Sequence, residues 1–78
     1  MDAYFNRGIV KGKLKDSKGA LQDFNRAIEL NPKKANAYLS RGLAKIVIGD
    51  KNGGCLDFSK AGELGNVSAY DLIKKYCN

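Results

Sequence analysis

The amino-acid sequence predicts an all-α fold made of two helical hairpins in tandem and one further helix. Three observations support this fold class: the chain repeats itself every 34 residues, apolar residues recur at helical spacing within each unit, and short polar segments separate the helices. We expect a single domain over residues 1–78. It would hold a first repeat at 2–34, a second at 35–67 and a capping helix at 68–77.

The repeat appears when residues 2–34 are aligned with residues 36–68. Twelve of these 33 aligned pairs are identical, and the stretch AYFNRG at 3–8 returns as AYLSRG at 37–42. Repeats of this period are typical of stacked helical units, because one unit cannot bury its apolar face alone. The sequence therefore predicts two similar hairpins packed side by side.

The first repeat is predicted to hold two helices, at 2–14 and 18–30. The second of them carries apolar residues at helical spacing, namely Ala20, Phe24, Ala27 and Ile28. The polar segment KDS separates the two helices, and its Asp16 is placed to cap the second one. Pro32 ends the repeat, because proline disfavours the helical conformation in the residue before it.

The second repeat follows the same plan, with helices predicted at 35–48 and 53–64. The segment GDKN separates them, and its Asp50 takes the capping place of Asp16. Gly65 suits a left-handed cap at the end of the second helix. In both hairpins we expect small residues where the helices cross and large aromatic residues where the crossing opens. The small residues are Gly8, Ala20, Gly42 and Gly54, and the aromatic residues are Tyr4, Phe24, Tyr38 and Phe58.

A fifth helix is predicted at 68–76. Ser68 and Asp71 have the spacing of an approximate capping box. One face of the helix is apolar and consists of Ala69, Leu72, Ile73 and Tyr76. Because Lys74 and Lys75 fall on the other face, we expect this helix to cover the second hairpin and present a polar surface to water.

An arginine stands sixteen residues before an aspartate in both repeats. Arg7 precedes Asp23 and Arg41 precedes Asp57, so each pair spans the two helices of one hairpin. We expect a structural ion pair in each repeat. Two independent solvated charges, or contacts to a ligand, are the alternatives.

Composition limits the classes of function. The net charge is +6, but the fourteen basic residues are spread along the chain and interleaved with eight acids, so nucleic-acid binding is not favoured. The longest apolar run is IVI at 46–48, which is too short to span a membrane. There is no histidine and no cluster of cysteines at metal-binding spacing. We therefore expect no enzymatic activity, catalytic residue, cofactor or metal site.

Two cysteines leave the compartment open. Cys55 lies early in the fourth predicted helix and Cys77 lies just beyond the fifth, so stacking of the helices would bring them close. They are either two buried thiols or a disulfide. A disulfide would indicate an oxidising compartment such as the periplasm, whereas free thiols would be compatible with the cytoplasm.

Six positions of each unit carry a pattern of aromatic and small residues, followed by proline in the first unit. They are Tyr4, Gly8, Ala20, Phe24, Ala27 and Pro32, and then Tyr38, Gly42, Gly54, Phe58, Ala61 and Asn66. On these residues the chain resembles the tetratricopeptide repeat family over essentially its whole length. The segments GGCLDF, ELG, AY and IKKYC resemble the C-terminal end of bacterial members, particularly those of Bacteroidetes. The chain departs from the family at Arg7 and Arg41, at Lys11 and Lys45, and at Asn66.

The resemblance implies a right-handed α-solenoid that acts as a protein-interaction scaffold. A partner peptide or helix would lie in the concave groove formed by the first helix of each repeat. By position, that groove would be lined by Phe5, Asn6, Ile9, Lys13, Asn36, Leu39, Ser40, Leu43, Ile46 and Val47. Phe5 and Ile9 stand where family members that clamp a carboxylate have Lys and Asn, so we expect no such clamp. An apolar groove of this kind suits an amphipathic helix or hydrophobic peptide.

Other interpretations stay open at this point. The groove residues could pack only within the stack, and the chain could be the C-terminal cap of a longer solenoid, since three repeats are usually needed for a stable array. A basic module that binds RNA or another polyanion is a less favoured alternative. The first helix has no capping helix of the kind predicted at 68–76, and it carries Tyr4, Phe5, Ile9 and Val10. We therefore also expect self-association through that end.

Overall fold

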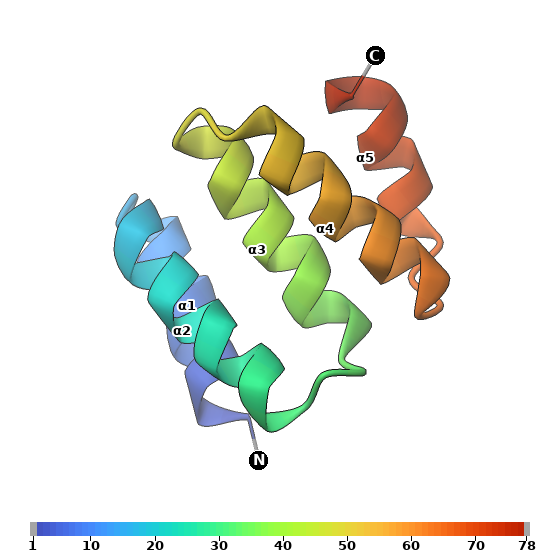
Figure 1. The fold of residues 1–78 in the computed structure, drawn as a ribbon. Helices are drawn as coiled ribbons and strands as arrows, with labels where there is room; N and C mark the ends of the chain where they lie inside the picture. The colour runs from blue at the N-terminus through green and yellow to red at the C-terminus, as the bar shows by residue number, and fades with distance from the viewer. Residues whose placement is uncertain (1, 78) are drawn as a thin grey trace.

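The computed structural model describes residues 2–77, and the first and last residues of the expected domain lie outside this range. The described chain forms the helices α1 (Ala3–Lys13), α2 (Ser17–Leu30), α3 (Ala35–Val47), α4 (Lys51–Glu63) and α5 (Ser68–Tyr76). Helices α1 and α2 form one hairpin, α3 and α4 form the next, and α5 packs on α4 at the far end of the stack (Figure 1). The predicted all-α helical repeat fold is confirmed.

Side-chain caps fix the start of the second helix in each hairpin. The Asp16 carboxylate accepts a hydrogen bond from the backbone N–H of Gly19, and the Asp50 carboxylate accepts one from Gly53, each at 3.0 Å. These contacts satisfy backbone donors that a helix start leaves unpaired. Because the cap lies at Asp50, helix α4 begins at Lys51, two residues before the predicted start at 53.

Three helices end in the same hydrogen-bonded turn, in which the residue after the C-cap has a positive φ. These residues are Lys15 at 66°, Gly49 at 94° and Gly65 at 109°. In the first turn the Asp16 N–H donates to the Lys11 carbonyl at 2.8 Å, and the other two turns repeat this bond. Glycine takes this conformation readily and lysine does not, so the first repeat carries backbone strain that the second avoids.

The start of α5 differs from the prediction. Ser68 is the first helical residue and not the cap, and no side chain caps the preceding Val67. The Asn66 side-chain oxygen instead accepts a hydrogen bond from the Ser68 N–H at 3.1 Å. The expected capping box of Ser68 and Asp71 is therefore wrong, because Asn66 already supplies an acceptor for the first turn.

Two apolar clusters form the core. The first centres on Ala20, Phe24 and Ala44, between the first hairpin and α3, and the second centres on Phe58, Ala61 and Ala69, between the second hairpin and α5. The glycine–aromatic arrangement is closer than expected. A Cβ atom at Gly8 would lie 2.7 Å from the Phe24 ring, and one at Gly42 would lie 2.8 Å from the Phe58 ring. The Phe24 and Phe58 rings thus lie directly on the glycines and not where the crossing opens.

Candidate functional site

A pocket of about 320 Å³ opens between α1 and α3, with the first half of α2 behind it. Its lining comprises Gly8, Ile9, Gly12, Lys13, Ser17, Ala20, Phe24, Ser40, Leu43, Ala44 and Val47. Five of the residues expected to line the groove are among them, namely Ile9, Lys13, Ser40, Leu43 and Val47. This volume falls at the lower end of the range of ligand pockets, roughly 300–1,000 Å³.

The remaining residues expected in the groove lie outside this pocket, and most of them have structural contacts. The centroids of the Phe5 and Phe24 rings lie 5.9 Å apart, and the Lys34 ammonium lies 4.7 Å from the centroid of the Phe5 ring. The Asn36 side-chain oxygen accepts a hydrogen bond from the Asn66 amide at 2.8 Å. Leu39 packs on the second core cluster, as does Ile46. Asn6 is exposed on α1.

The lining of the pocket is apolar with a single charge. Ala20, Phe24 and Ala44 form a buried floor, and Val47 is 73% exposed at the rim. Lys13 is the only ionisable residue of the lining and is itself exposed. The pocket can therefore remove an apolar side chain from water while one cationic group stays at its edge.

Gly12 lines the pocket, although it was not among the residues that the sequence predicted to line the groove. It forms part of the pocket wall, and a Cβ atom built on it would meet no heavy atom within 4 Å. The signal was present in the alignment of the repeats, because Gly12 aligns with Ile46, a large residue. A change from large to small at one aligned position indicates a possible void, but only the packing shows whether neighbours fill it.

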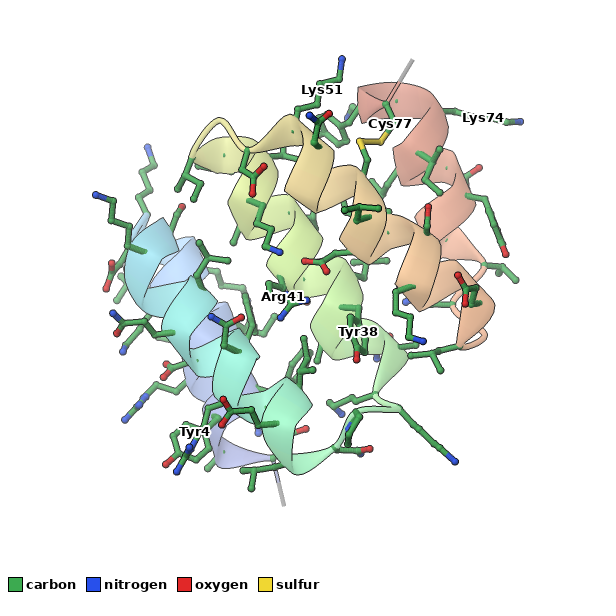
Figure 2. All side chains as sticks on the ribbon, viewed as in Figure 1. Tyr4, Tyr38, Arg41, Lys51, Lys74 and Cys77 are labelled. Carbon is green, nitrogen blue, oxygen red and sulfur yellow. A yellow bond between two sulfur atoms is a disulfide. The ribbon has the colours of Figure 1, made fainter. Side chains whose placement is uncertain are left out.

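Asp57 is the centre of a nearly buried ionic cluster in the second hairpin. Arg41 donates to its two carboxylate oxygens, from Nε at 2.8 Å and Nη2 at 2.7 Å. Lys45 Nζ lies 3.2 Å from the same carboxylate, and Arg41 Nη1 reaches the Asn25 side-chain oxygen on α2 at 3.0 Å. The Arg41 side chain is 20% exposed and that of Asp57 is 6% exposed. Figure 2 shows Arg41 reaching from α3 toward α2, so this cluster also links the two hairpins.

The first hairpin holds the same cluster around Asp23. Arg7 donates from Nε at 2.9 Å and Nη2 at 2.7 Å, and Lys11 Nζ lies 3.3 Å away. The hydrogen bond from Arg7 holds the pKa of Asp23 below its usual value, although burial opposes this shift. Arg7 differs from Arg41 in its 59% exposure. Sequence spacing placed both arginines opposite their aspartates, but it missed Lys11 and Lys45, whose identical positions four residues after each arginine were the available signal.

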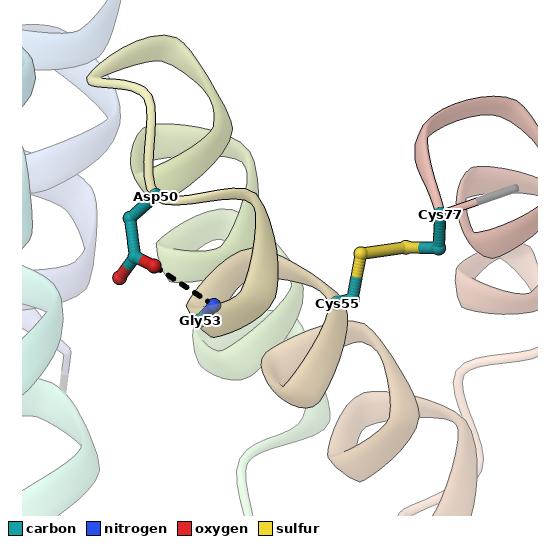
Figure 3. Close-up of a disulfide and its surroundings, with 4 residues drawn as sticks. All are labelled: Asp50, Gly53, Cys55 and Cys77. Carbon is teal, nitrogen blue, oxygen red and sulfur yellow. Dashed lines mark hydrogen bonds between the residues drawn. A yellow bond between two sulfur atoms is a disulfide. The ribbon is translucent and has the colours of Figure 1, made fainter.

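Cys55 and Cys77 form a disulfide with their Cα atoms 6.0 Å apart. Figure 3 shows this bond running from the first turns of α4 to the end of α5, close to the Asp50 cap. It closes a segment with a sequence separation of 22 residues, which contains most of α4 and all of α5. The fifth helix is therefore held on the second hairpin covalently as well as by packing.

Basic side chains outside the two clusters also meet acids of the same chain. Lys34 Nζ lies 3.1 Å from the Asp2 carboxylate, and Arg26 lies 3.0 Å from Glu29. Lys74 points away from the helices in Figure 2.

Of the described helices, none has both the length and the apolar character needed to cross a membrane.

The outer face of α1 (Ala3, Tyr4, Val10 and Leu14) is a second open surface. Among the aligned residues of the second repeat, Ala37 is fully buried and Ala44, which packs with Phe24 of α2, is 8% exposed. Tyr38 packs on the second core cluster, and Ile48 is 44% exposed. In the first repeat, by contrast, Val10 on α1 is 54% exposed and Leu14, the C-cap residue that follows α1, is 75% exposed. The face that joins the second repeat to the first is thus left uncovered on the first repeat.

Residues 2–34 match the family model described as the tetratricopeptide repeat. No match to a curated protein was found for this chain. Tetratricopeptide repeats generally mediate protein–protein interaction, and the family is generally a non-catalytic scaffold. The match covers the first hairpin, and the second hairpin has the same helices and the same ionic cluster 34 residues later. The matched segment is thus similar to a tetratricopeptide repeat, and the five-helix repeat fold agrees with that similarity.

Proposed function

We propose that the chain is a non-catalytic interaction scaffold that binds a partner peptide or helix in the groove between α1 and α3. The observation that supports this proposal is the open apolar pocket between these helices, with Val47 and Leu43 on its wall. Amphipathic helices and hydrophobic peptides bind grooves of this chemistry through a few apolar anchors. Several basic side chains already form ion pairs with acids of the same chain, so they form no continuous cationic surface for a polyanion, and this favours a protein partner.

Selection from a displayed library of random 12-residue peptides, followed by fluorescence polarisation, tests this proposal. Val47→Arg places a charge at the rim of the pocket and should weaken the selected peptides about tenfold or more. Leu56→Arg is a matched control, because Leu56 is equally exposed at 73% but lies on α4, outside the pocket. Equal loss in both variants, or no peptide above background, would overturn the proposal.

Self-association through the outer face of α1 is a second candidate, favoured by the exposure of Val10 and Leu14. A second copy that covers this face would bury apolar side chains, as Ala44 is buried against Phe24 of α2. Sedimentation equilibrium should then show association that the double variant Val10→Lys, Leu14→Lys abolishes. A chain that stays monomeric at millimolar concentration would rule this candidate out.

A further inference from the structure

The pocket between α1 and α3 exists because the first repeat lacks a side chain that the second repeat has. Gly12 and Ile46 are aligned positions on α1 and α3. The Ile46 side chain lies on α4, where its Cγ1 and Cδ1 atoms would be 2.8 Å from a Cβ atom built at Gly54. At Gly12 the corresponding direction is open, since no heavy atom of the surrounding described residues lies within 4 Å of a Cβ there. We call this space, lined by Gly12, Ala20, Leu43 and Val47, the Gly12 pocket.

The helix that follows each repeat accentuates the difference. Leu72, Ile73 and Tyr76 of helix α5 pack on the same core cluster as Ile46 does. Helix α3 instead turns the small residues Ser40 and Ala44 toward the Gly12 pocket, alongside Leu43. The same junction is thus packed with side chains at the C-terminal end of the stack and left partly open in its middle.

We propose that the Gly12 pocket receives one aliphatic side chain of the partner, of the size of isoleucine or leucine, with an acidic residue beside it. This inference rests on the proposed function and specifies the partner that the groove would take. An aliphatic occupant follows from the second repeat, in which Ile46 fills the equivalent space. It also follows from the walls, because a polar side chain would lose its water and find mainly the hydroxyl groups of Ser17 and Ser40.

The acidic neighbour follows from charge complementarity. Lys13 is the only charged residue in the lining, and no acidic side chain contributes to it. Among the described residues, Lys13 is exposed and no ion pair engages it, unlike Lys11 two residues earlier, which lies 3.3 Å from Asp23. A carboxylate next to the aliphatic anchor would therefore meet a cation at the pocket edge without displacing an existing partner.

The decisive experiment combines a variant of the protein with a variant of the peptide. The probe is the tightest peptide from the random 12-residue library, and its aliphatic residues are replaced by alanine one at a time. On the wild-type protein, one replacement should weaken binding about 10- to 200-fold. Gly12→Ile fills the pocket from inside, so binding to this variant should be weak and the same replacement should change it less than twofold.

Folding is not expected to obscure this test. The space around a Cβ atom at Gly12 is open, and replacing glycine within a helix generally stabilises it. Thermal unfolding of Gly12→Ile should therefore occur at or above the wild-type temperature. Gly12→Ala is a smaller step in the same direction and should weaken the probe less than Gly12→Ile does.

The acidic preference is tested by repeating the selection on Lys13→Glu. Wild-type protein should enrich Asp or Glu next to the aliphatic anchor, and Lys13→Glu should enrich Lys or Arg there. Lys60→Glu on α4 is the control and should keep the wild-type preference. Unchanged enrichment on Lys13→Glu would overturn the acidic part of the inference.

The outcomes separate this inference from the proposed function. If Val47→Arg abolishes binding while Gly12→Ile binds the probe with full affinity, the groove binds peptides and the Gly12 pocket is not their anchor site. If selected peptides are insensitive to Val47→Arg, or none is selected, the proposed function fails and this inference fails with it. If Gly12→Ile binds the probe weakly but alanine replacement of the aliphatic residue still weakens that binding as much as on the wild type, the anchor assignment would also be overturned.

Discussion

The two junctions of the stack use the same backbone plan and differ in how completely they are filled. Between the second hairpin and α5, Phe58 is fully buried and Ile46, Tyr76 and Cys77 pack around it. Between the first hairpin and α3, Phe24 borders the open Gly12 pocket. A repeat thus keeps its fold through the glycine–aromatic contact and the ionic cluster, while the positions around them decide whether the junction is closed or open.

The ionic clusters show the same contrast. The Asp57 cluster is shielded because α2 lies on one side and provides Asn25 as a further acceptor for Arg41. The Asp23 cluster has the same bonds, but its Arg7 lies on the outer face of the stack. Identical residues are therefore expected to contribute differently, because water competes more strongly for Arg7, which is 59% exposed, than for Arg41, which is 20% exposed.

The largest difference is expected from the two buried phenylalanines. Phe58→Ala should lower the free energy of unfolding by about 5 kcal/mol and Phe24→Ala by about 3 kcal/mol, the two ends of the usual range for such changes. The reason is that Phe24 already borders an opening, so its removal leaves less new cavity. Urea unfolding followed by circular dichroism measures both values. Equal losses would contradict the contrast between a closed and an open junction.

The disulfide should add stability to the closed junction between α4 and α5 and not to the open one. Replacing both cysteines, Cys55→Ser with Cys77→Ser, should lower the free energy of unfolding by about 3 kcal/mol under oxidising conditions, because the cross-link restricts the unfolded chain. The measurement is repeated with a reducing agent, in which wild type and variant should become nearly equal. Hydrogen exchange should localise the early opening to α5. A wild type unaffected by the reducing agent would argue against this role.

The ionic clusters should respond in the order of their shielding. Arg41→Ala should cost about 2 kcal/mol, because it leaves the buried Asp57 with Lys45 alone and removes the bond to Asn25. Arg7→Ala should cost clearly less, since water reaches the arginine in the wild type. Chemical unfolding of Arg41→Ala and Arg7→Ala gives the comparison, and a double-mutant cycle with Asp57→Asn alone and combined with Arg41→Ala measures the coupling energy of the second pair. A larger loss for Arg7→Ala would reverse our interpretation.

The smallest effect concerns the turn after the first helix of each repeat. Lys15→Gly should raise the free energy of unfolding by about 1 kcal/mol, because Lys15 has a φ of 66° at the place that Gly49 takes in the second repeat. A gain of this size corresponds to roughly 4–8 °C in melting temperature for a domain of this length. The reciprocal change Gly49→Lys should lower the melting temperature, and a rise there would contradict the explanation.

Much of the fold could be predicted because its signals are local and occur twice. The caps at Asp16 and Asp50 depend on a carboxylate three residues from a free N–H, which spacing alone reveals. The start of α5 was less predictable. Ser68 and Asn66 both suit a helix start, and only the backbone path between α4 and α5 decides which side chain is placed to bond the first turn.

The candidate groove was predictable only in part. The resemblance to a known repeat family, carried over by position, implied that Ile9, Leu43 and Val47 line the groove, and all three lie in the wall of the pocket. It could not show that Leu39 is taken up by the second core cluster or that Asn36 is bonded to Asn66. Those contacts depend on how α5 and the preceding loop fold back over the second hairpin.

The sequence by itself determined the number of helices, their order and the repeat that relates them. The helices follow from apolar spacing at 3.6 residues per turn and from the polar breaks between them, and the ion pairs of Arg7 with Asp23 and of Arg41 with Asp57 were expected from the repeated spacing of 16 residues but needed the packing of each hairpin to form. Only the tertiary structure decided that the cysteines are bonded and that the absence of a side chain at Gly12 leaves a pocket. Whether a missing side chain becomes a void depends on the size and approach of every neighbour, and these are set by packing in three dimensions.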